Sequence, residues 1–121
     1  MKIELAKSEL IHFVGIGGIG MSGLALIMKE LGFNVQGSDI SNNKNIERLK
    51  KNKVKAIIGH NKQNIKKATI VVISSAIDSQ NIELLTAERL RIPIKKNTRS
   101  LNIAIAAAIT LSEAVKQNLD C

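Results

Sequence analysis

The chain has 121 residues, of which 45% are apolar and 2% aromatic, and its formal net charge is +8. This length fits one domain with an aliphatic core, and the absence of a run of about 18 apolar residues argues against a membrane span. The only cysteine, Cys121, excludes an internal disulfide and favours the cytoplasmic location that we expect.

The positive charge is concentrated in one segment. Nine Lys or Arg and a single acid, Glu47, lie between Lys44 and Lys67. Such a run either attracts an anionic partner or forms a solvated face, and we favour the solvated face. No aromatic residue interrupts these lysines, so we do not expect nucleic acid to stack on this surface.

Short apolar runs alternate with helical patterns as far as residue 96. Apolar and β-branched runs predict strands at 10–14, 34–39, 55–58, 69–73 and 92–95, and helical spacing predicts helices at 21–31, 43–51 and 82–90. Pro93 restricts the last strand to an edge or to a strand start. The alternation predicts an α/β fold, a Rossmann-like parallel sheet of about five strands flanked by helices.

The last part of the chain has a different composition. Residues 100–117 are rich in Ala and Ile and predict one amphipathic helix, which would cover the sheet or mediate self-association. We therefore divide the chain into a Rossmann-like domain at 1–96 and a helical tail at 97–121.

The first predicted strand runs into a glycine-rich turn, Gly15-Ile16-Gly17-Gly18-Ile19-Gly20. In a G-x-G-x-x-G turn, Gly15 permits the tight bend, Gly17 permits close approach of a phosphate, and Gly20 permits close packing of the helix on the sheet. The free N–H groups and the dipole of the following helix favour an anion. We therefore expect a nucleotide-linked diphosphate here, rather than a turn that serves packing alone.

Polar residues follow the other strands at the same edge. Asp39 ends the second strand, 19 residues after Gly20, where an acid can accept hydrogen bonds from ribose. His60 follows the third strand and either faces the base of the ligand or caps a turn. Ser74 and Ser75 follow the fourth strand and either bind phosphate or sugar or cap the next turn. His12, inside the first strand, is expected to be a core residue.

The segment from Ile11 to Ala25, with His12, the glycine turn and Met21-Ser22-Gly23, resembles the opening of the UDP-N-acetylmuramate–L-alanine ligases of the Mur ligase family. The resemblance covers roughly residues 8–96 and continues through Gly37-Ser38-Asp39, Gly59-His60-Asn61, residues 72–77 and residues 91–94. The related ligases that attach a tripeptide share much of it, and they stay an alternative.

The resemblance implies a domain that binds UDP-N-acetylmuramate. The turn, with Gly15, Gly17, Gly18, Ile19 and Gly20, would hold the diphosphate; Ser38, Asp39 and His60 would lie by the uridine, and Ser74 and Ser75 by the phosphates. We expect no catalytic residue and no metal ligand among them. ATP and magnesium are expected only in the full-length family enzymes.

The chain also departs from the family. It has no Gly-x-x-Gly-Lys-Thr-type loop for ATP, so we expect a truncated domain that is inactive alone and that associates with the missing ligase domains or with a second copy. Arg99-Ser100-Leu101-Asn102 and the Ala-rich segment after it weakly resemble the end of knotted RNA 2′-O-methyltransferases. The alternative functions are a nucleotide or UDP-sugar binding module without catalysis, a nicotinamide-dependent oxidoreductase and an RNA methyltransferase.

Overall fold

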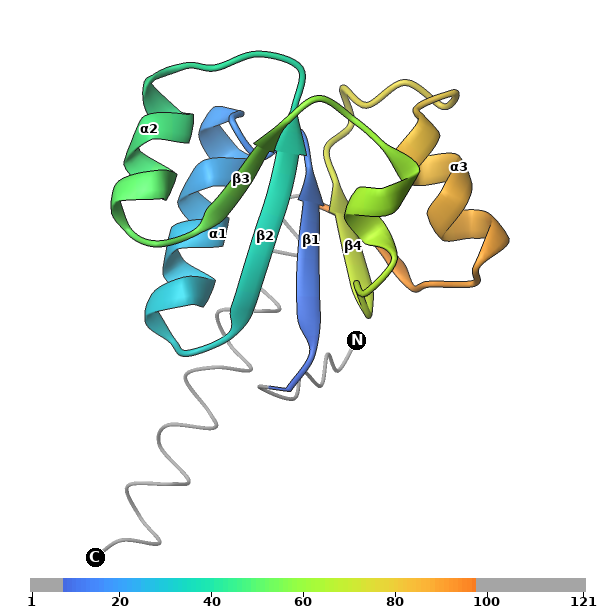
Figure 1. Cartoon of the computed structure of the whole chain (residues 1–121), viewed down its shortest axis with the longest axis horizontal. Helices are drawn as coiled ribbons and strands as arrows, with labels where there is room; N and C mark the ends of the chain where they lie inside the picture. Colours follow the sequence, from blue (N-terminus) through green and yellow to red (C-terminus); the bar gives the residue numbers. More distant parts are fainter. Residues whose placement is uncertain (1–7, 98–121) are drawn as a thin grey trace, which may run out of the picture.

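The computed structural model describes residues 8–97, which form a parallel sheet between two layers of helices (Figure 1). The sheet has the strand order β3-β2-β1-β4-β5, with every neighbouring pair parallel. This confirms the predicted fold. The elements in chain order are β1 (Leu10–Val14), α1 (Ile19–Glu30), β2 (Asn34–Asp39), α2 (Lys44–Lys51), β3 (Lys55–Ile58), the 3₁₀ helix η1 (Lys62–Ile65), β4 (Ile70–Ile73), α3 (Ile82–Arg89) and β5 (Ile94–Lys96).

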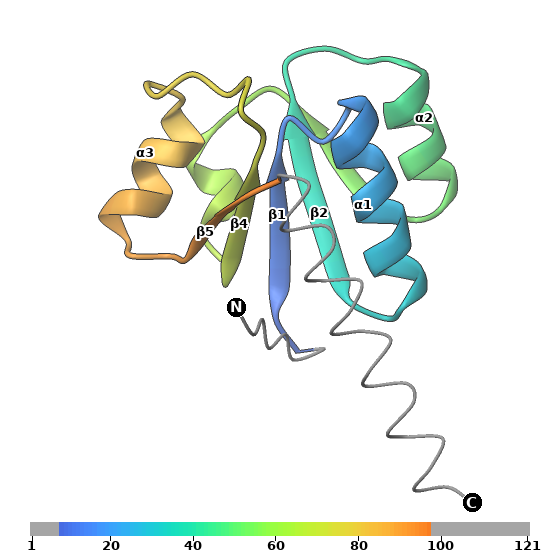
Figure 2. The same ribbon diagram turned by 180° about the vertical axis from the view of Figure 1, so that it is seen from behind.

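Helices cover both faces of the sheet, and the alternation of side chains along each strand fills both cores. On β1, Ile11 and Phe13 belong to the apolar cluster under α1 and α2, whereas Val14 belongs to the cluster under α3 and η1. Val72 and Val71 on β4 divide in the same way. Figures 1 and 2 show α1 and α2 together at one side of the molecule and α3 at the other.

The face under α3 carries buried polar side chains next to its apolar cluster. His12 on β1 and Ser38 on β2 are fully buried, and Gln36 is 9% exposed. Their alternate positions on two adjacent strands place them on one face. The two central strands thus supply a polar patch to the core under α3.

The predicted elements differ from the structure in a few places. The fifth strand begins at Ile94 rather than at residue 92 because Pro93, which has no N–H, precedes it; this strand lies at an edge of the sheet, as Pro93 predicted (Figure 2). The helix η1 was not predicted. The predicted helix at 100–117 lies outside the described residues. None of the helices within 8–97 has the length and apolar character needed to cross a membrane.

Candidate functional site

The parallel sheet brings the predicted site residues to one edge. The glycine turn follows β1, Asp39 ends β2, His60 follows β3, and Ser74 and Ser75 follow β4. Because all five strands run in the same direction, these positions share the carboxyl edge of the sheet. β1 pairs with β2 on one side and with β4 on the other. The glycine turn therefore lies at the point where the strand order of the sheet reverses.

Gly15 and Ile16 anchor the start of the turn to β2. Both backbone N–H groups donate to the carbonyl of Ser38, over 2.8 and 2.9 Å. Gly15 has a φ of +82°, a conformation that L side chains rarely adopt. The tight bend expected of Gly15 is therefore present.

Gly17 has a different neighbour from the one expected. Its N–H donates to Oδ2 of Asp39 over 2.8 Å, and a Cβ at Gly17 would lie 2.8 Å from that oxygen and 3.0 Å from Nδ2 of Asn43. Asn43 and Asn45 also donate to the Gly17 carbonyl. In this structure the missing Cβ makes room for protein side chains, and the Gly17 N–H is already used.

The close packing expected of Gly20 belongs to another glycine. A Cβ at Gly20 would meet only Nδ2 of Asn97, at an ordinary 3.6 Å. A Cβ at Gly37 on β2 would lie 2.5 Å from Cδ1 of Ile16 and 2.6 Å from the carbonyl oxygen of Phe13. The expectation for Gly20 was wrong because Gly20 is exposed and its Cβ position meets no atom of the sheet.

The N-terminus of α1 is open. Its N-cap, Gly18, has no side chain to accept from the helix, and the first N–H of this turn with a backbone acceptor is that of Ser22, bonded to the Gly18 carbonyl. Within 8–97, the N–H groups of Ile19, Gly20 and Met21 have no recorded acceptor. Gly18, Ile19 and Gly20 are exposed, and Ile19 is 89% exposed.

The other helices are capped by their own side chains. Asn43 accepts from the first turn of α2, Asn61 from that of η1, and Asn81 from that of α3. Within the described residues, α1 is therefore the one α-helix whose N-terminal donors have no side-chain cap, which leaves them open to an anion.

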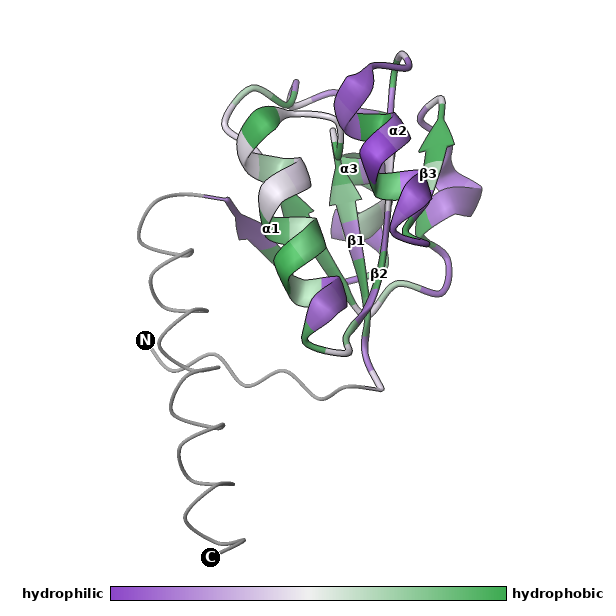
Figure 3. Ribbon diagram, turned by 90° about the vertical axis from the view of Figure 1, so that its left-hand side faces the viewer, coloured by the Kyte–Doolittle hydropathy of each residue, from purple (hydrophilic) through white to green (hydrophobic). Residues whose placement is uncertain are grey.

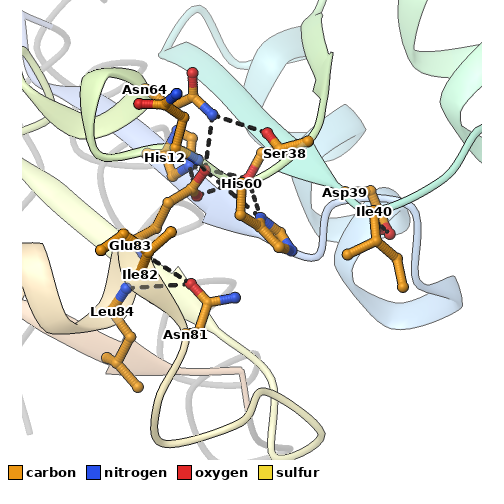
Figure 4. Close-up of polar contacts among 12 residues, drawn as sticks. His12, Ser38, Asp39, Ile40, His60, Asn64, Asn81, Ile82, Glu83 and Leu84 are labelled. Atoms are coloured by element: carbon orange, nitrogen blue, oxygen red, sulfur yellow. Dashed lines mark hydrogen bonds and ion pairs between the residues drawn. The ribbon is translucent and has the colours of Figure 1, made fainter.

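Glu83, which the sequence did not point to, is buried under this edge (Figure 4). It lies in the first turn of α3 and its carboxylate is fully enclosed. His12 Nε2 lies 2.7 Å and Ser38 Oγ 2.6 Å from Oε1, and Oε2 accepts from Asn61 N and Asn64 Nδ2. Burial alone would raise the pKa of Glu83, but the hydrogen bonds from His12, Ser38 and Asn64 lower it from 4.5 to about 2.

The two histidines differ in exposure. His12 is fully buried against Glu83 and Gln36, which confirms that it is a core residue. The side chain of His60 is 14% exposed, and its Nδ1 lies 2.9 Å from Ser38 Oγ. His60 thus connects the buried polar residues around Glu83 to the surface. Ser38 lies beneath His60 and offers no exposed atom.

The two serines after β4 also differ. Ser74 is half-buried, and its hydroxyl accepts from the N–H of Ala76 over 3.3 Å, which is the turn-capping alternative considered for it. Ser75 is exposed, with no recorded hydrogen bond to a residue within 8–97. Its hydroxyl is the more accessible of the two.

The basic residues between Lys44 and Lys67 lie on α2, on β3, on η1 and in the adjoining turns. All nine are exposed, and Figure 3 shows α2 as largely hydrophilic. Ile46 and Leu49, on the inner side of α2, are fully buried. This arrangement is that of a solvated helix face, as expected.

Comparison with known proteins gives concordant results for sequence and structure. A family model described as "Mur ligase family, catalytic domain" matches residues 10–108. The UDP-N-acetylmuramate–L-alanine ligase of Pelagibacter ubique (strain HTCC1062) is 69% identical over 101 residues, which make up 84% of this chain and 22% of that ligase. The chain thus spans about a fifth of the length of the curated relatives it matches.

Solved structures agree with the sequence comparison. A UDP-N-acetylmuramate–alanine ligase from Thermotoga maritima aligns with a TM-score of 0.75 and 32% identity, over 81% of this chain and 23% of that one. The UDP-N-acetylmuramate:L-alanyl-γ-D-glutamyl-meso-diaminopimelate ligase of Neisseria meningitides aligns with a TM-score of 0.69 and 28% identity, over 74% of this chain and 28% of that one.

Proposed function

Because the chain belongs to the Mur ligase family, we propose that its sheet domain binds UDP-N-acetylmuramate, the substrate named in its relatives. The proposal extends to the ATP-dependent addition of L-alanine by the full-length enzyme of which such a domain is part. The 69% identity to an alanine-adding ligase favours that reaction over tripeptide addition. A cytoplasmic location and assembly with further ligase domains, or with a second copy, are parts of the same proposal.

The observation that carries the proposal is the open N-terminus of α1. Three successive N–H groups, at Ile19, Gly20 and Met21, stand at the positive end of a 12-residue helix. A diphosphate carries the charge and the acceptor oxygens that such a helix end favours. We therefore assign the diphosphate to these donors and to the exposed Gly18.

The remaining predicted residues divide into two groups. His60, Asp39, Ser74 and Ser75 lie at the carboxyl edge, where a nucleoside and its phosphates would contact them. Asp39 keeps a carboxylate oxygen on the Gly17 N–H and another on the Ile40 N–H. Gly15, Gly17 and Ser38 shape the site from below, and we propose no direct ligand contact for the Ser38 side chain because it is fully buried.

The phosphoryl chemistry is assigned elsewhere in the full-length enzyme. Forming an acyl phosphate from ATP needs a phosphate-binding lysine and magnesium. Among residues 8–97 no three His, Cys, Asp or Glu side chains are grouped so as to hold a metal ion. We propose that this domain supplies substrate binding, and that ATP and magnesium are held by other parts of the enzyme.

Calorimetric titration of the chain with four ligands tests the proposal. UDP-N-acetylmuramate and UDP should bind, whereas NAD and S-adenosylmethionine should not. A preference for NAD, or indifference to both uridine nucleotides, would overturn the proposal. An assay for ATP-dependent alanine addition by the chain alone should show no turnover; turnover would contradict the assignment of the chemistry to other domains.

A further inference from the structure

Glu83 sits at the centre of a hydrogen-bond network in which its carboxylate receives only donors (Figure 4). His12 and Ser38 lie against Oε1, and Asn61 N–H and Asn64 Nδ2 donate to Oε2. These four groups occupy the four acceptor positions of an ionised carboxylate. Asn61 N–H and Asn64 Nδ2 can only donate, so the network suits the charged form of the carboxylate.

Gln36 fixes the proton of His12. Its Nε2 donates to the backbone carbonyl of Asn64 over 2.7 Å, and that carbonyl can only accept. The second hydrogen of the same amide points at Nδ1 of His12, 2.9 Å away, so this nitrogen is an acceptor. His12 therefore carries its proton on Nε2 and donates it to Glu83.

The same logic extends to His60 through Ser38. A serine hydroxyl has one hydrogen, and at 2.6 Å from Oε1 that hydrogen goes to Glu83. The Ser38 oxygen is then only an acceptor towards Nδ1 of His60, 2.9 Å away. Nδ1 also lies 3.5 Å from Oε2 of Glu83, so a neutral His60 carries its proton on Nδ1, and Nε2 keeps its lone pair.

We propose that Glu83 is a positioning residue for the nucleotide site: acting through Ser38, it fixes the proton of His60 on Nδ1 and so presents Nε2 as a hydrogen-bond acceptor at the carboxyl edge. Glu83 itself touches no ligand, because its side chain is fully buried. His60 is partly exposed, and no residue within 8–97 is recorded as a partner of its Nε2.

A hydrogen-bond acceptor at Nε2 of His60 determines which chemical group of a ligand can bind there. A phosphate offers only acceptor oxygens, so it belongs at the helix end of α1 and not at Nε2 of His60. A nucleoside offers donors, namely a ribose hydroxyl or the imide N–H of uracil. The inference rests on the proposed function for this ligand, but the proton positions do not depend on any ligand.

Nitrogen NMR of the histidine rings in the free, full chain tests the proton positions directly. The wild-type protein should show His60 protonated on Nδ1 and His12 protonated on Nε2. Glu83→Gln releases the Ser38 hydroxyl to donate to His60, so the His60 proton should move to Nε2. Ser38→Ala, a milder change, removes the nearer acceptor for Nδ1–H, at 2.9 Å against 3.5 Å for Oε2 of Glu83, and should weaken the preference. Glu88→Gln, at an exposed position on the same helix, is the control and should change neither ring.

UDP titrations then connect the proton position to binding. Each of the two variants should lose about five- to tenfold in affinity for UDP, the effect of one hydrogen bond. If the donor is the uracil imide, the two variants should bind CDP as tightly as the wild type does. If the donor is the ribose 2′-hydroxyl, they should bind 2′-deoxy-UDP as tightly as the wild type does. A wild-type His60 protonated on Nε2, or unchanged UDP affinity in folded variants, would overturn the inference. Correct proton positions without any UDP binding would instead reject the proposed function and leave the proton assignment standing.

Discussion

Ile16 packs over Gly37 so closely that any side chain at position 37 would collide with it. The Cβ position of Gly37 lies 2.5 Å from Cδ1 and 2.6 Å from Cβ of Ile16. It also lies 2.6 Å from the carbonyl oxygen of Phe13 on the adjacent strand. Ile16 is the fully buried residue of the glycine turn, so this contact seats the turn on the sheet.

Gly37→Ala is therefore expected to destabilise the domain by about 1–3 kcal/mol, or more, because one of the colliding atoms is backbone and cannot turn away. Urea unfolding followed by circular dichroism measures this. Gly23→Ala is the matched control, since nothing lies within 4 Å of its Cβ position on α1. That change should raise stability by about 0.5–1 kcal/mol, as expected for an alanine inside a helix. Equal stability of Gly37→Ala and wild type would contradict the packing described.

The buried Glu83 predicts an acid-sensitive fold. Its pKa is lowered from 4.5 to about 2 in the folded chain, so the folded state holds the charged form more firmly than the unfolded state does. The resulting stability is complete above about pH 4.5 and is lost as the pH falls towards 2. A pKa difference of this size between the folded and unfolded states corresponds to about 3 kcal/mol of folding stability.

Chemical unfolding of the wild type between pH 6 and pH 2.5 should show this loss. The free energy of unfolding of Glu83→Gln should fall furthest below that of the wild type at pH 6, and this difference should shrink as the pH falls to 2.5. Glu88→Gln, exposed on α3, provides the comparison. If the difference in free energy of unfolding between Glu83→Gln and wild type does not change with pH, the carboxylate is not held ionised in the folded state.

Asn81 supports Glu83 from the start of the same helix. Its side-chain oxygen accepts from the N–H groups of Glu83 and Leu84, over 2.9 and 3.3 Å. Asn81→Ala should lower the free energy of unfolding by about 1 kcal/mol, whereas Asn81→Ser should retain most of it because serine also caps. Thermal unfolding of the two variants side by side makes the comparison, and equal midpoints would show that the cap contributes nothing.

The strands were predictable because their apolar runs end at glycine, proline or polar residues. The predicted bounds of β1, β2 and β3 agree with the structure. The helix η1 was missed because four residues, Lys-Gln-Asn-Ile, are too few to show a period. The packing role of Gly20 was wrongly assigned, and the contacts of Gly17 with Asp39 and Asn43 were not foreseen, because the motif gives spacing only and says nothing of what each missing Cβ would meet.

The importance of Glu83 could not be predicted from its own position. An acid after an asparagine N-cap is usual at an exposed helix start, where the helix dipole favours it. A signal did exist in the strands: His12 is the one polar residue of β1, and Gln36 and Ser38 stand two apart on β2, where side chains two apart share a face. Such a buried polar patch requires a partner, and only the packing of α3 shows which residue supplies it.

Ile19→Pro separates the helix donors of α1 from every other feature of the site. Position 19 is the first residue of the helix, where proline is well tolerated, and Gly18 before it has φ −64° and ψ 154°, which proline's predecessor prefers. The Ile19 side chain is 89% exposed, so little packing is lost. The change therefore deletes one N–H donor and leaves the fold intact.

UDP affinity should fall in Ile19→Pro by about tenfold or more, the effect of losing one hydrogen bond to a charged group, while Ile19→Ala, which keeps the N–H, should bind nearly as well as wild type. A substitution at Gly17 cannot make this distinction, because its new side chain would strike Asp39 and Asn43 whether or not a ligand binds. Calorimetry of the two Ile19 variants, with unfolding curves to verify their stability, completes the test. If Ile19→Pro binds UDP as tightly as Ile19→Ala does, the Ile19 N–H makes no contact with the diphosphate, and the ligand must lie elsewhere along the carboxyl edge.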